Sequence, residues 1–464
     1  MRSPTSLCQA TAYQFTAARL FVVLIVLSSL TFSPLGLYGQ GATLPTKSTN
    51  RAEYKTLDQA LAAPDKVVIL NLSGQMLSEL PADVSKFKNL EAIDLSFNQL
   101  SALPAELFTL SNLQSINLLF NQLDKLPPEI AKLTKLRSLN LASNKLTTLP
   151  AEFAQLKALQ QIDISGNPLG GLSAEVLSLT ELRELSASNV KLTTLRSDIG
   201  NLTNLTYLDL SNNQLSVLPA ELGKLTRLET LELGSNQIQS LPDDFCNLVK
   251  LRSLTLRSNK LMALPECVGN LVKLQTLILT KNRLQRLPEG IKELVGLRDL
   301  DISKNRLAAL PDGFTELASL QTFDASSNYL TELPKNIANL TALQSLNLTS
   351  NEFKQFPTEI TLLSALRTLE FANNLLVRLP AEIGQMKALQ SLNVRGNRIA
   401  VMPPEIATLE RLQVLNLGYN EFQTLPADIS KLSRLQVLNI VKNPMLSSEV
   451  ERIKALVPSV QVEY

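Results

Sequence analysis

The stretch Leu90-Glu-Ala-Ile93-Asp-Leu95-Ser-Phe-Asn98 decides the fold, because its pattern returns along almost the whole chain. The same L-x-x-L-x-L-x-x-N pattern stands at residues 205–213 and 412–420, and the period is 23 residues without insertion or deletion. Stepping by 23 from position 75 to 443 gives seventeen slots, and fifteen of them hold asparagine. A length of 464 residues would allow two or three ordinary domains, but this period predicts one stack of repeats.

Each part of the pattern has a physical reason. Ile93 and Leu95 lie at strand spacing, so both point to one face, which we predict to be the interior of a coil. The asparagine that follows is predicted to turn inward and to pair backbone groups where the chain leaves the strand. Gln75 and Val190 occupy the two slots without asparagine. The predicted ladder comprises Asn98, Asn121, Asn144, Asn167, Asn213, Asn236, Asn259, Asn282, Asn305, Asn328, Asn351, Asn374, Asn397, Asn420 and Asn443.

The other half of the repeat is predicted to form the convex side. An apolar residue followed by proline stands there in fourteen slots, usually as Leu-Pro and as Phe356-Pro357 or Met402-Pro403 in two of them. Proline presets φ and donates no amide proton, which suits an irregular segment. One coil cannot bury its leucines alone, so neighbouring coils must stack, and both ends of the stack need covers.

The front cover is predicted over residues 53–66. Thr56 and Gln59 form a capping box that begins a short helix. Tyr54, Leu57 and Leu61 can share one face of it, and the helix is predicted to end at Pro64.

The back cover is predicted over residues 447–464, after repeats at 67–446. Ser448 and Glu451 form a second capping box, and Val450, Ile453 and Leu456 make the buried stripe of its helix. Pro458 is predicted to end this helix, and residues 460–464 to close the stack as a strand.

The N-terminus predicts export. Arg2 and Arg19 are the only charges before an apolar run over residues 20–27, and small residues follow it. This is the pattern of a secretory signal peptide, predicted over residues 1–40, with a polar tether at 41–52. The alternative is a short uncleaved anchor, but the run is shorter than the roughly 20 apolar residues that span a bilayer. We therefore expect a secreted or periplasmic protein without a stable membrane span.

Cys246 and Cys267 remain after the predicted cleavage, 21 residues apart where the period is 23. A disulfide needs Cα atoms within about 7 Å, and the offset makes that distance borderline. We favour two buried small hydrophobic side chains over a disulfide.

Composition argues against several function classes. The chain has no histidine, which removes Ser-His-Asp and Cys-His catalysis and imidazole metal sites. Its net charge of +2 gives no reason to expect nucleic acid, which requires a clustered basic face. We predict no enzyme activity, no cofactor and no bound metal.

The convex half, with residues 126–133 reading L-P-x-x-I-x-x-L, resembles the 23-residue leucine-rich repeats of Ras-pathway scaffold proteins and of many bacterial repeat proteins. Residues 54–67 look like the leader helix of the bacterial members. The resemblance covers about nine-tenths of the chain. It implies an α/β solenoid, a leucine-rich-repeat horseshoe of about seventeen repeats with a parallel concave β-sheet, and recognition of a partner on that sheet. It does not identify the partner, because the matching residues are the structural ones.

Candidate contact residues are those that the repeat leaves free. The central outward column of the sheet, Asp94, Asn117, Asp209 and their equivalents, is short and polar, which indicates either a solvated face or a polar recognition surface. Phe97 and Phe120, beside Leu119, are predicted either to anchor a partner or to fold back over the coil edge. Two further candidates are Tyr207 and Tyr419.

An acidic group forms a further candidate: Asp299, Asp301 and Asp324 cluster near Lys281 and Lys304. Asp301 and Asp324 are expected about 5 Å apart, a spacing that retaining glycosidases use. A bare sheet offers no pocket to raise one pKa, so a solvated patch, or contact with a cation or a basic side chain, is favoured.

The fifth and sixth repeats break the pattern together. They carry Gly170-Gly171, Ser173 and Arg196 in place of proline, Ala187 in place of leucine, and Val190. Such departures mark either a functional place or drift with a local change of curvature, and we favour drift.

The sequence thus predicts a non-catalytic exported protein that binds a protein, a peptide or a glycan on its concave face. The alternative is an intracellular signalling scaffold of the Ras-pathway type, in which the apolar N-terminal run is not a signal.

Overall fold

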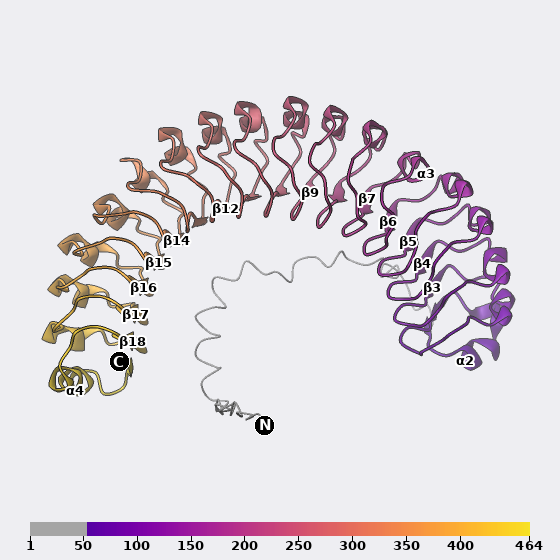
Figure 1. The fold of residues 1–464 in the computed structure, drawn as a ribbon. Helices are drawn as coiled ribbons and strands as arrows, with labels where there is room; N and C mark the ends of the chain where they lie inside the picture. Colours follow the sequence, from indigo (N-terminus) through magenta and orange to yellow (C-terminus); the bar gives the residue numbers. More distant parts are fainter. Residues whose placement is uncertain (1–52) are drawn as a thin grey trace, which may run out of the picture. The chain divides into compact units, whose positions relative to one another are not determined.

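The computed structural model describes residues 53–464. The predicted signal peptide and tether lie outside these residues, so both remain predictions. Within the described part, the chain winds as a right-to-left succession of coils whose strands line the inner side of an arch, with short helices on its outer side (Figure 1). The predicted solenoid with a parallel concave sheet is confirmed.

One parallel sheet of 19 strands lines the concave side. Strands β2 to β18 follow the repeat, and each pairs with the next in a register of 23 residues, as in Leu254 with Leu277. The strands are β1 (Glu53–Tyr54), β2 (Ile69–Asn71), β3 (Ala92–Asp94), β4 (Ser115–Asn117), β5 (Ser138–Asn140), β6 (Gln161–Asp163), β7 (Glu184–Ser186), β8 (Tyr207–Asp209), β9 (Thr230–Glu232), β10 (Ser253–Thr255), β11 (Thr276–Ile278), β12 (Asp299–Asp301), β13 (Thr322–Asp324), β14 (Ser345–Asn347), β15 (Thr368–Glu370), β16 (Ser391–Asn393), β17 (Val414–Asn416), β18 (Val437–Asn439) and β19 (Gln461–Glu463). We number the coils 1 to 17 after strands β2 to β18.

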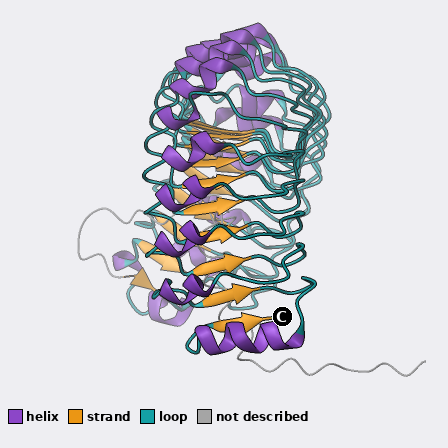
Figure 2. Cartoon of the chain, turned by 90° about the vertical axis from the view of Figure 1, so that its left-hand side faces the viewer, coloured by secondary structure: helices purple, strands orange, loops and turns teal. Residues whose placement is uncertain are grey.

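The convex side carries one short helical turn in each of coils 1 to 16, nearly always a 3₁₀ helix (Figure 2). Most begin directly after the repeat proline, whose extended backbone (Pro219 has φ −70° and ψ 148°) leads the chain into the turn. The turns are η3 (Ala82–Lys86), η4 (Ala105–Thr109), η5 (Pro128–Lys132), η6 (Ala151–Gln155), α3 (Ala174–Leu177), η7 (Ser197–Asn201), η8 (Ala220–Lys224), η9 (Asp243–Asn247), η10 (Glu266–Asn270), η11 (Glu289–Glu293), η12 (Asp312–Glu316), η13 (Ile337–Asn339), η14 (Thr358–Leu362), η15 (Ala381–Gln385), η16 (Pro404–Thr408) and η17 (Ala427–Lys431).

The core lies between the sheet and these turns. The inward strand residues, for example Ile93 and Leu95, are fully buried, as are Leu100 and Leu107 on the way to the convex side. One continuous apolar cluster therefore runs through all the coils. Since each coil buries its leucines only against its neighbours, stability comes from stacking.

The asparagine ladder is confirmed, and its chemistry is repeated from coil to coil. The Asn282 amide group donates to the carbonyl oxygens of Leu279 in its own coil and Leu256 in the preceding coil, both at 2.9 Å. Its oxygen accepts the backbone N–H of Leu261 at 3.1 Å. Each asparagine thus ties two coils together at the end of the strand.

Val190 changes the turns of coils 5 and 6. The N–H groups of Val190 and Leu192 both donate to the Asn213 oxygen, at 3.1 and 3.0 Å. In coil 5 the Gly170 N–H bonds the Val190 carbonyl oxygen at 2.9 Å, with Gly170 at φ +74°, a conformation that suits glycine. A cavity of about 340 Å³ lies beside this irregular turn, lined by Thr147, Leu149, Ile164, Leu169, Leu172 and Val176 among others.

The front cover differs in part from the prediction. Thr56 caps helix α2 (Leu57–Leu61), since its hydroxyl oxygen accepts the Gln59 N–H at 3.3 Å. Tyr54, however, is not on the helix: it lies in β1, which pairs with β2 and extends the sheet by one strand. Helix α2 ends at Leu61, shortly before Pro64, and Pro64 then begins a separate 3₁₀ helix, η2 (Pro64–Lys66).

The back cover also differs at its start. Helix α4 (Ser447–Leu456) begins one residue before Ser448, and no side chain caps it, so the predicted capping box is wrong. Glu449 instead accepts the Leu425 N–H of coil 16 at 3.0 Å and pairs with Arg452 at 2.6 Å. The Glu449 carboxylate therefore joins helix α4 to the preceding coil. Of the predicted buried stripe, Ile453 is buried, while Val450 and Leu456 are half-buried and pack against the core. The closing strand β19 pairs with β18.

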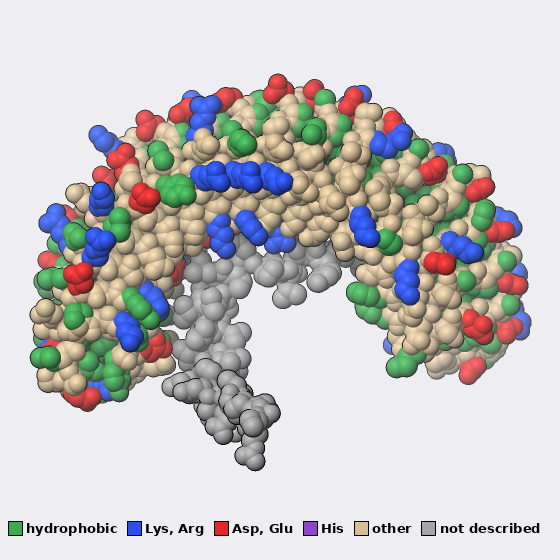
Figure 3. Space-filling model, in the orientation of Figure 1, with side chains coloured by type: hydrophobic (Ala, Val, Ile, Leu, Met, Phe, Trp, Pro, Cys, Tyr) green, Lys and Arg blue, Asp and Glu red, His purple; other side chains and the backbone are tan. Residues whose placement is uncertain are grey.

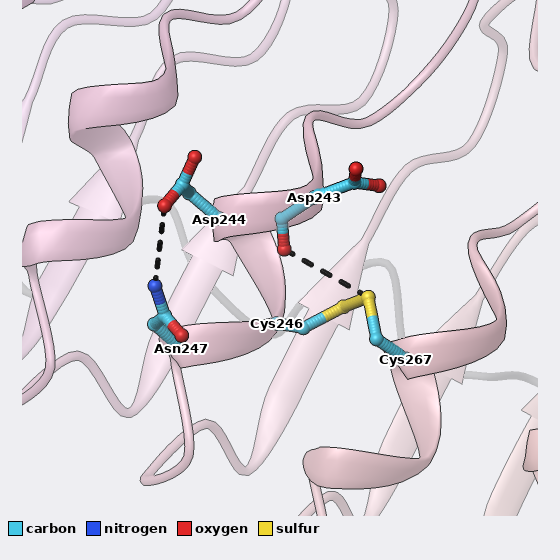
Figure 4. The surroundings of a disulfide bond; sticks show 5 residues. All are labelled: Asp243, Asp244, Cys246, Asn247 and Cys267. Carbon is cyan, nitrogen blue, oxygen red and sulfur yellow. Dashed lines mark hydrogen bonds between the residues drawn. A yellow bond between two sulfur atoms is a disulfide. The ribbon is translucent and has the colours of Figure 1, made fainter.

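The two cysteines form a disulfide, contrary to our preference for unbridged side chains. Their Cα atoms are 5.8 Å apart, and the bond joins η9 to η10 on the convex side (Figure 4). Cys246 is buried, but Cys267 is half-exposed. The two-residue offset is absorbed because both cysteines lie in short turns rather than in the paired strands.

No helix within residues 53–464 is long and apolar enough to cross a membrane.

Candidate functional site

The central outward column of the sheet is mainly structural. In twelve of the seventeen repeat strands its Asp or Asn oxygen accepts the backbone N–H two residues on, as Asp209 does from Ser211 at 2.8 Å. Such a bond closes the strand end in the manner of an Asx turn. The short polar residues of this column are thus explained by the fold. The five exceptions are Ser186, Glu232, Thr255, Ile278 and Glu370.

The first residue of each strand points outward as well and does not close the strand end. Most members of this column are small, with serine or threonine in nine of the seventeen strands. Coils 5 to 7 depart from this, with Gln161, Glu184 and Tyr207 on neighbouring strands paired in register. Gln161 donates to Glu184 at 3.0 Å. These long side chains are not required by the repeat, and so they can serve recognition.

Acidic groups surround Tyr207. Burial raises the pKa values of Asp163 and Asp209, against the lowering effect of their bonds from Ser165 and Ser211. Burial, together with the charges of Asp209, Glu232, Asp163 and Glu184, raises the pKa of the Tyr207 hydroxyl. Tyr207 therefore stays a neutral hydrogen-bond donor in an acidic, partly dehydrated part of the sheet. The 23-residue spacing of the first strand residues was enough to predict that Gln161, Glu184 and Tyr207 lie side by side, but only Tyr207 was predicted as a contact residue.

Glu370 on β15 is the carboxyl most affected by its surroundings. Burial raises its pKa to about 7, and the charge of Asp324 adds to this, while a 2.6 Å bond from the Asn393 amide opposes it. Near neutral pH this side chain can accept or release a proton with a small change of environment.

Phe97 and Phe120 are exposed and do not fold back into the core. Their side chains are 56% and 51% accessible, and the rings stack on each other at 5.1 Å. Leu119 beside them is half-buried. Both phenylalanines have positive φ, 56° and 53°, at a position where other coils mostly carry glycine, serine, asparagine or lysine. A bulky residue at positive φ raises the free energy of the folded state. Because the two rings are exposed, they bury little apolar surface that could offset this.

The predicted acidic group is brought together by the fold. Asp299 and Asp301 share β12, and Asp301 pairs in register with Asp324 on β13. Asp301 accepts from Ser303, and Asp324 from Ser326 and Asn347. Burial raises the pKa of Asp301, while the bonds from Ser303 and, to a smaller extent, the charge of Lys304 oppose this. Because both carboxylates are held by bonds that close strand ends, their role is mainly structural.

Tyr419 lies in coil 16 and is 46% accessible. The Arg395 guanidinium sits 4.2 Å from the centre of its ring, so the tyrosine already has a cation partner. The candidate residues are therefore spread over the solenoid: the phenylalanine stack in coils 2 and 3, Tyr207 in coil 7, the aspartates in coils 11 and 12, and Tyr419 in coil 16.

Comparison with known families gives matches over much of the chain. The model described as "Leucine rich repeat" matches residues 111–169, 180–238, 203–261, 341–399 and 387–445, and the "Leucine-rich repeat region" model matches residues 243–328. No curated protein matches the chain in sequence.

Solved structures give matches of similar breadth. A leucine-rich-repeat protein of Leptospira interrogans is 36% identical, with a TM-score of 0.77, over 89% of this chain and 100% of that one. A plant peptide hormone receptor, solved in complex with its ligand RGF2, is 26% identical with a TM-score of 0.64, over 90% of this chain and 80% of the receptor. An internalin of Listeria monocytogenes, 21% identical with a TM-score of 0.53 over 76% of this chain and 88% of that one, shares the fold.

Proposed function

Because the chain belongs to the leucine-rich-repeat family, we propose that it is a non-catalytic binding protein that recognises a protein or peptide on its concave sheet. The observation that carries the proposal is the row of Gln161, Glu184 and Tyr207 on three adjacent strands. These residues vary freely within the repeat, point outward and stand where most other coils carry small side chains. The fold does not need them.

The surroundings of this row suit a polypeptide partner. Tyrosine is enriched in the cores of protein interfaces, where its ring adds contact area and its hydroxyl adds a hydrogen bond. Asp163 and Asp209, with pKa values raised by burial, lie beside it. A partner lysine or arginine placed between them would favour their charged forms. The peptide complex of the related plant receptor supports the same class of ligand.

Site-specific photo-crosslinking tests the concave face. A photoreactive phenylalanine analogue is placed at Tyr207, and the protein is exposed to the cell envelope and culture medium of its own organism. We expect one discrete crosslinked species, which an excess of unlabelled protein suppresses. The same analogue at Lys292, exposed on η11 at the convex side, is the matched control.

Two substitutions then separate recognition from folding. Tyr207→Ala with Glu184→Ala is expected to weaken binding of the crosslinked species at least tenfold. Thr368→Ala with Ser391→Ala, in the same column of coils 14 and 15, should leave it unchanged. Crosslinks confined to Lys292 would contradict the proposal, as would equal binding by both double variants.

We also infer that the protein is exported, on the basis of the Cys246–Cys267 disulfide. Disulfides persist in oxidising compartments and are rare in the cytosol. Cell fractionation with N-terminal sequencing checks this: a mature chain that begins near residue 41, in the periplasm or the medium, is expected. A cytoplasmic chain that keeps Met1 would instead favour the intracellular scaffold.

A further inference from the structure

Seven cationic side chains gather on one flank of coils 9 to 11, although the chain as a whole is nearly neutral. They occupy the turns that surround Asn259, Asn282 and Asn305, in the segments 257–263, 280–286 and 303–309, which contain no Asp or Glu. We call this surface the basic flank. Figure 3 shows Lys and Arg side chains side by side in rows near the middle of the arch. The members of the basic flank are Arg257, Lys260, Lys281, Arg283, Arg286, Lys304 and Arg306.

Backbone hydrogen bonds hold these residues in stacked rows. The Arg283 N–H donates to the Leu261 carbonyl oxygen, next to Lys260, at 2.9 Å, and the Arg306 N–H donates to Leu284 at the same distance. Lys260, Arg283 and Arg306 therefore follow one another at the spacing of the coils, about 5 Å. Lys281 and Lys304 form a second row, and their N–H groups bond the next coil at 2.9 and 2.8 Å.

The charges of the flank are largely unneutralised within the protein. None of the ion pairs within residues 53–464 involves any of the seven. Lys260 donates to the neutral Gln237 side chain at 2.9 Å, while Arg257 and Lys304 act at longer range on the concave carboxyls Glu232 and Asp301. Six of the seven are exposed and Lys260 is half-buried. Like charges about 5 Å apart repel one another, so an anion that bridges them would be stabilised.

We propose that the basic flank is a docking site for an acidic polypeptide segment, distinct from the concave site. Four of the seven cations are arginines, whose planar guanidinium binds carboxylates with two parallel hydrogen bonds. Exposed Met262 and Tyr329 border the flank, at 52% accessibility each. Arginine, methionine and tyrosine are the residues enriched in protein interfaces, which favours a polypeptide over a nucleic acid. The three coils span about 10 Å, the length of roughly three extended residues.

Fluorescence anisotropy with a defined probe tests the proposal. The probe is a labelled twelve-residue peptide of alternating glutamate and serine, titrated with the full mature chain. We expect saturable binding at near-physiological salt that weakens as salt rises, since the contacts are ionic. The triple variant Lys260→Glu, Arg283→Glu, Arg306→Glu should weaken binding at least tenfold.

A matched control stands in the same column of other coils. Lys145, Lys191 and Arg398 also follow the ladder position directly, and Lys145 donates to Gln122 much as Lys260 donates to Gln237. The triple variant with glutamate at these three positions should bind the probe within twofold of the wild type. A thermal melt of both triple variants checks that folding is intact, as these side chains lie outside the core.

Three outcomes would overturn the proposal. The first is equal loss of binding in both triple variants, which would indicate net charge rather than a site. The second is no saturable binding of the peptide at all. The third is at least tenfold tighter binding, through the same three residues, of a heparin-derived oligosaccharide or a single-stranded DNA of equal formal charge. The Tyr207→Ala, Glu184→Ala variant should keep full peptide binding, which separates failure of this site from failure of the concave one.

Discussion

At the scale of the residue, the turn beside each ladder asparagine governs which side chains the repeat tolerates. The residue before the asparagine takes a positive φ in coil after coil, between 52° and 60° wherever it is not glycine. Where the asparagine is missing, the residue after the slot also turns: Met76 has φ 57° and Lys191 has φ 60°. The asparagine oxygen of the following coil then accepts two N–H groups instead of one. Where a coil lacks the asparagine, the backbone after that position turns to positive φ, and the asparagine of the next coil accepts the additional N–H.

Asn282→Ala tests the contribution of one ladder position. The change leaves the Leu261 N–H without its partner in the core. The Leu256 and Leu279 carbonyl oxygens each lose one of two bonds and keep those from Asn259 and Asn305. A buried backbone group without a partner destabilises by about 1–3 kcal/mol, so we expect a loss of about 2 kcal/mol, measured by urea denaturation. Asn270→Ala, exposed at the end of η10, is the control and should change stability by less than about 0.5 kcal/mol. A loss at position 282 no larger than at 270 would contradict the role given to the ladder.

Glu370→Gln tests the effect of pH at one buried carboxyl. Its pKa is raised from the ordinary 4.5 to about 7, so the folded protein holds a proton that the unfolded chain releases between these values. The stability that Glu370 contributes is therefore greatest below pH 4.5 and falls as pH rises to about 7. Glutamine keeps a carbonyl oxygen for Asn393 and removes the ionisation. We expect the variant to be more stable than the wild type by about 1 kcal/mol at pH 7.5, below the limit of about 3 kcal/mol because solvent screens the charge.

Urea midpoints at pH 4.5 and pH 7.5 decide this prediction. The advantage of Glu370→Gln should nearly vanish at the lower pH. The exposed Glu352→Gln is the control and should show no such difference between the two conditions. A wild type that gains stability relative to Glu370→Gln on going to alkaline pH would have the opposite sign and would refute the assignment.

At the scale of the element, the sequence predicts repeated structure better than it predicts single events. The strands, the ladder and the proline-led turns recur, so an error in one repeat would be corrected by the others. The back cover occurs once. There Ser448 has the spacing of a capping box, but Glu449 is drawn into contact with Leu425 and Arg452, and the helix begins earlier without a side-chain cap. The start of helix α4 is thus set by a contact between residues 24 positions apart in the sequence. A capping-box pattern, which spans four residues, cannot predict such a contact.

The disulfide between η9 and η10 shows the same limit and gives a prediction of its own. Cys246 and Cys267 enclose about twenty residues, and loop-closure entropy for such a loop corresponds to about 3 kcal/mol. We expect the Cys246→Ser, Cys267→Ser variant to unfold at lower urea concentration by that amount or somewhat less, since the two coils are already stacked. Dithiothreitol should lower the midpoint of the wild type to that of the variant and leave the variant unchanged. Equal midpoints of the untreated proteins would show that the bond contributes nothing to stability.

At the scale of the whole molecule, the fold converts a nearly neutral composition into separate charged surfaces. A net charge of +2 predicts no basic face, yet the period places Lys260, Arg283 and Arg306 in one column. The columns could be written down from the sequence once the period was known. The central column was more difficult, since its acidic and amide side chains look like a recognition surface until their bonds to the strand ends are seen.

Removing residues 447–464 tests whether the stack depends on its back cover. Without α4 and β19, the edge of β18 and the apolar residues beneath it, including Leu438 and Ile440, would meet solvent. An unprotected sheet edge pairs with other chains, so we expect the truncated protein to self-associate. Light scattering coupled to gel filtration measures this. The variant Lys454→Ala, which keeps the cover, is the control and should elute as the wild type does; a truncated protein that behaves identically would show that the cover is dispensable.

The disulfide also sets how the protein would respond to mechanical force. Since neighbouring coils are joined side by side, tension between the two ends of the chain would peel the coils away one after another from either terminus. Peeling would release the full extended length of each coil except at η9 and η10, where the covalent bond bridges Cys246 and Cys267. There the twenty or so enclosed residues, roughly 70 Å of extended chain, would stay locked under load. Under such tension the unfolded chain would therefore extend less far than its number of residues allows, and reduction of this single bond would lengthen it.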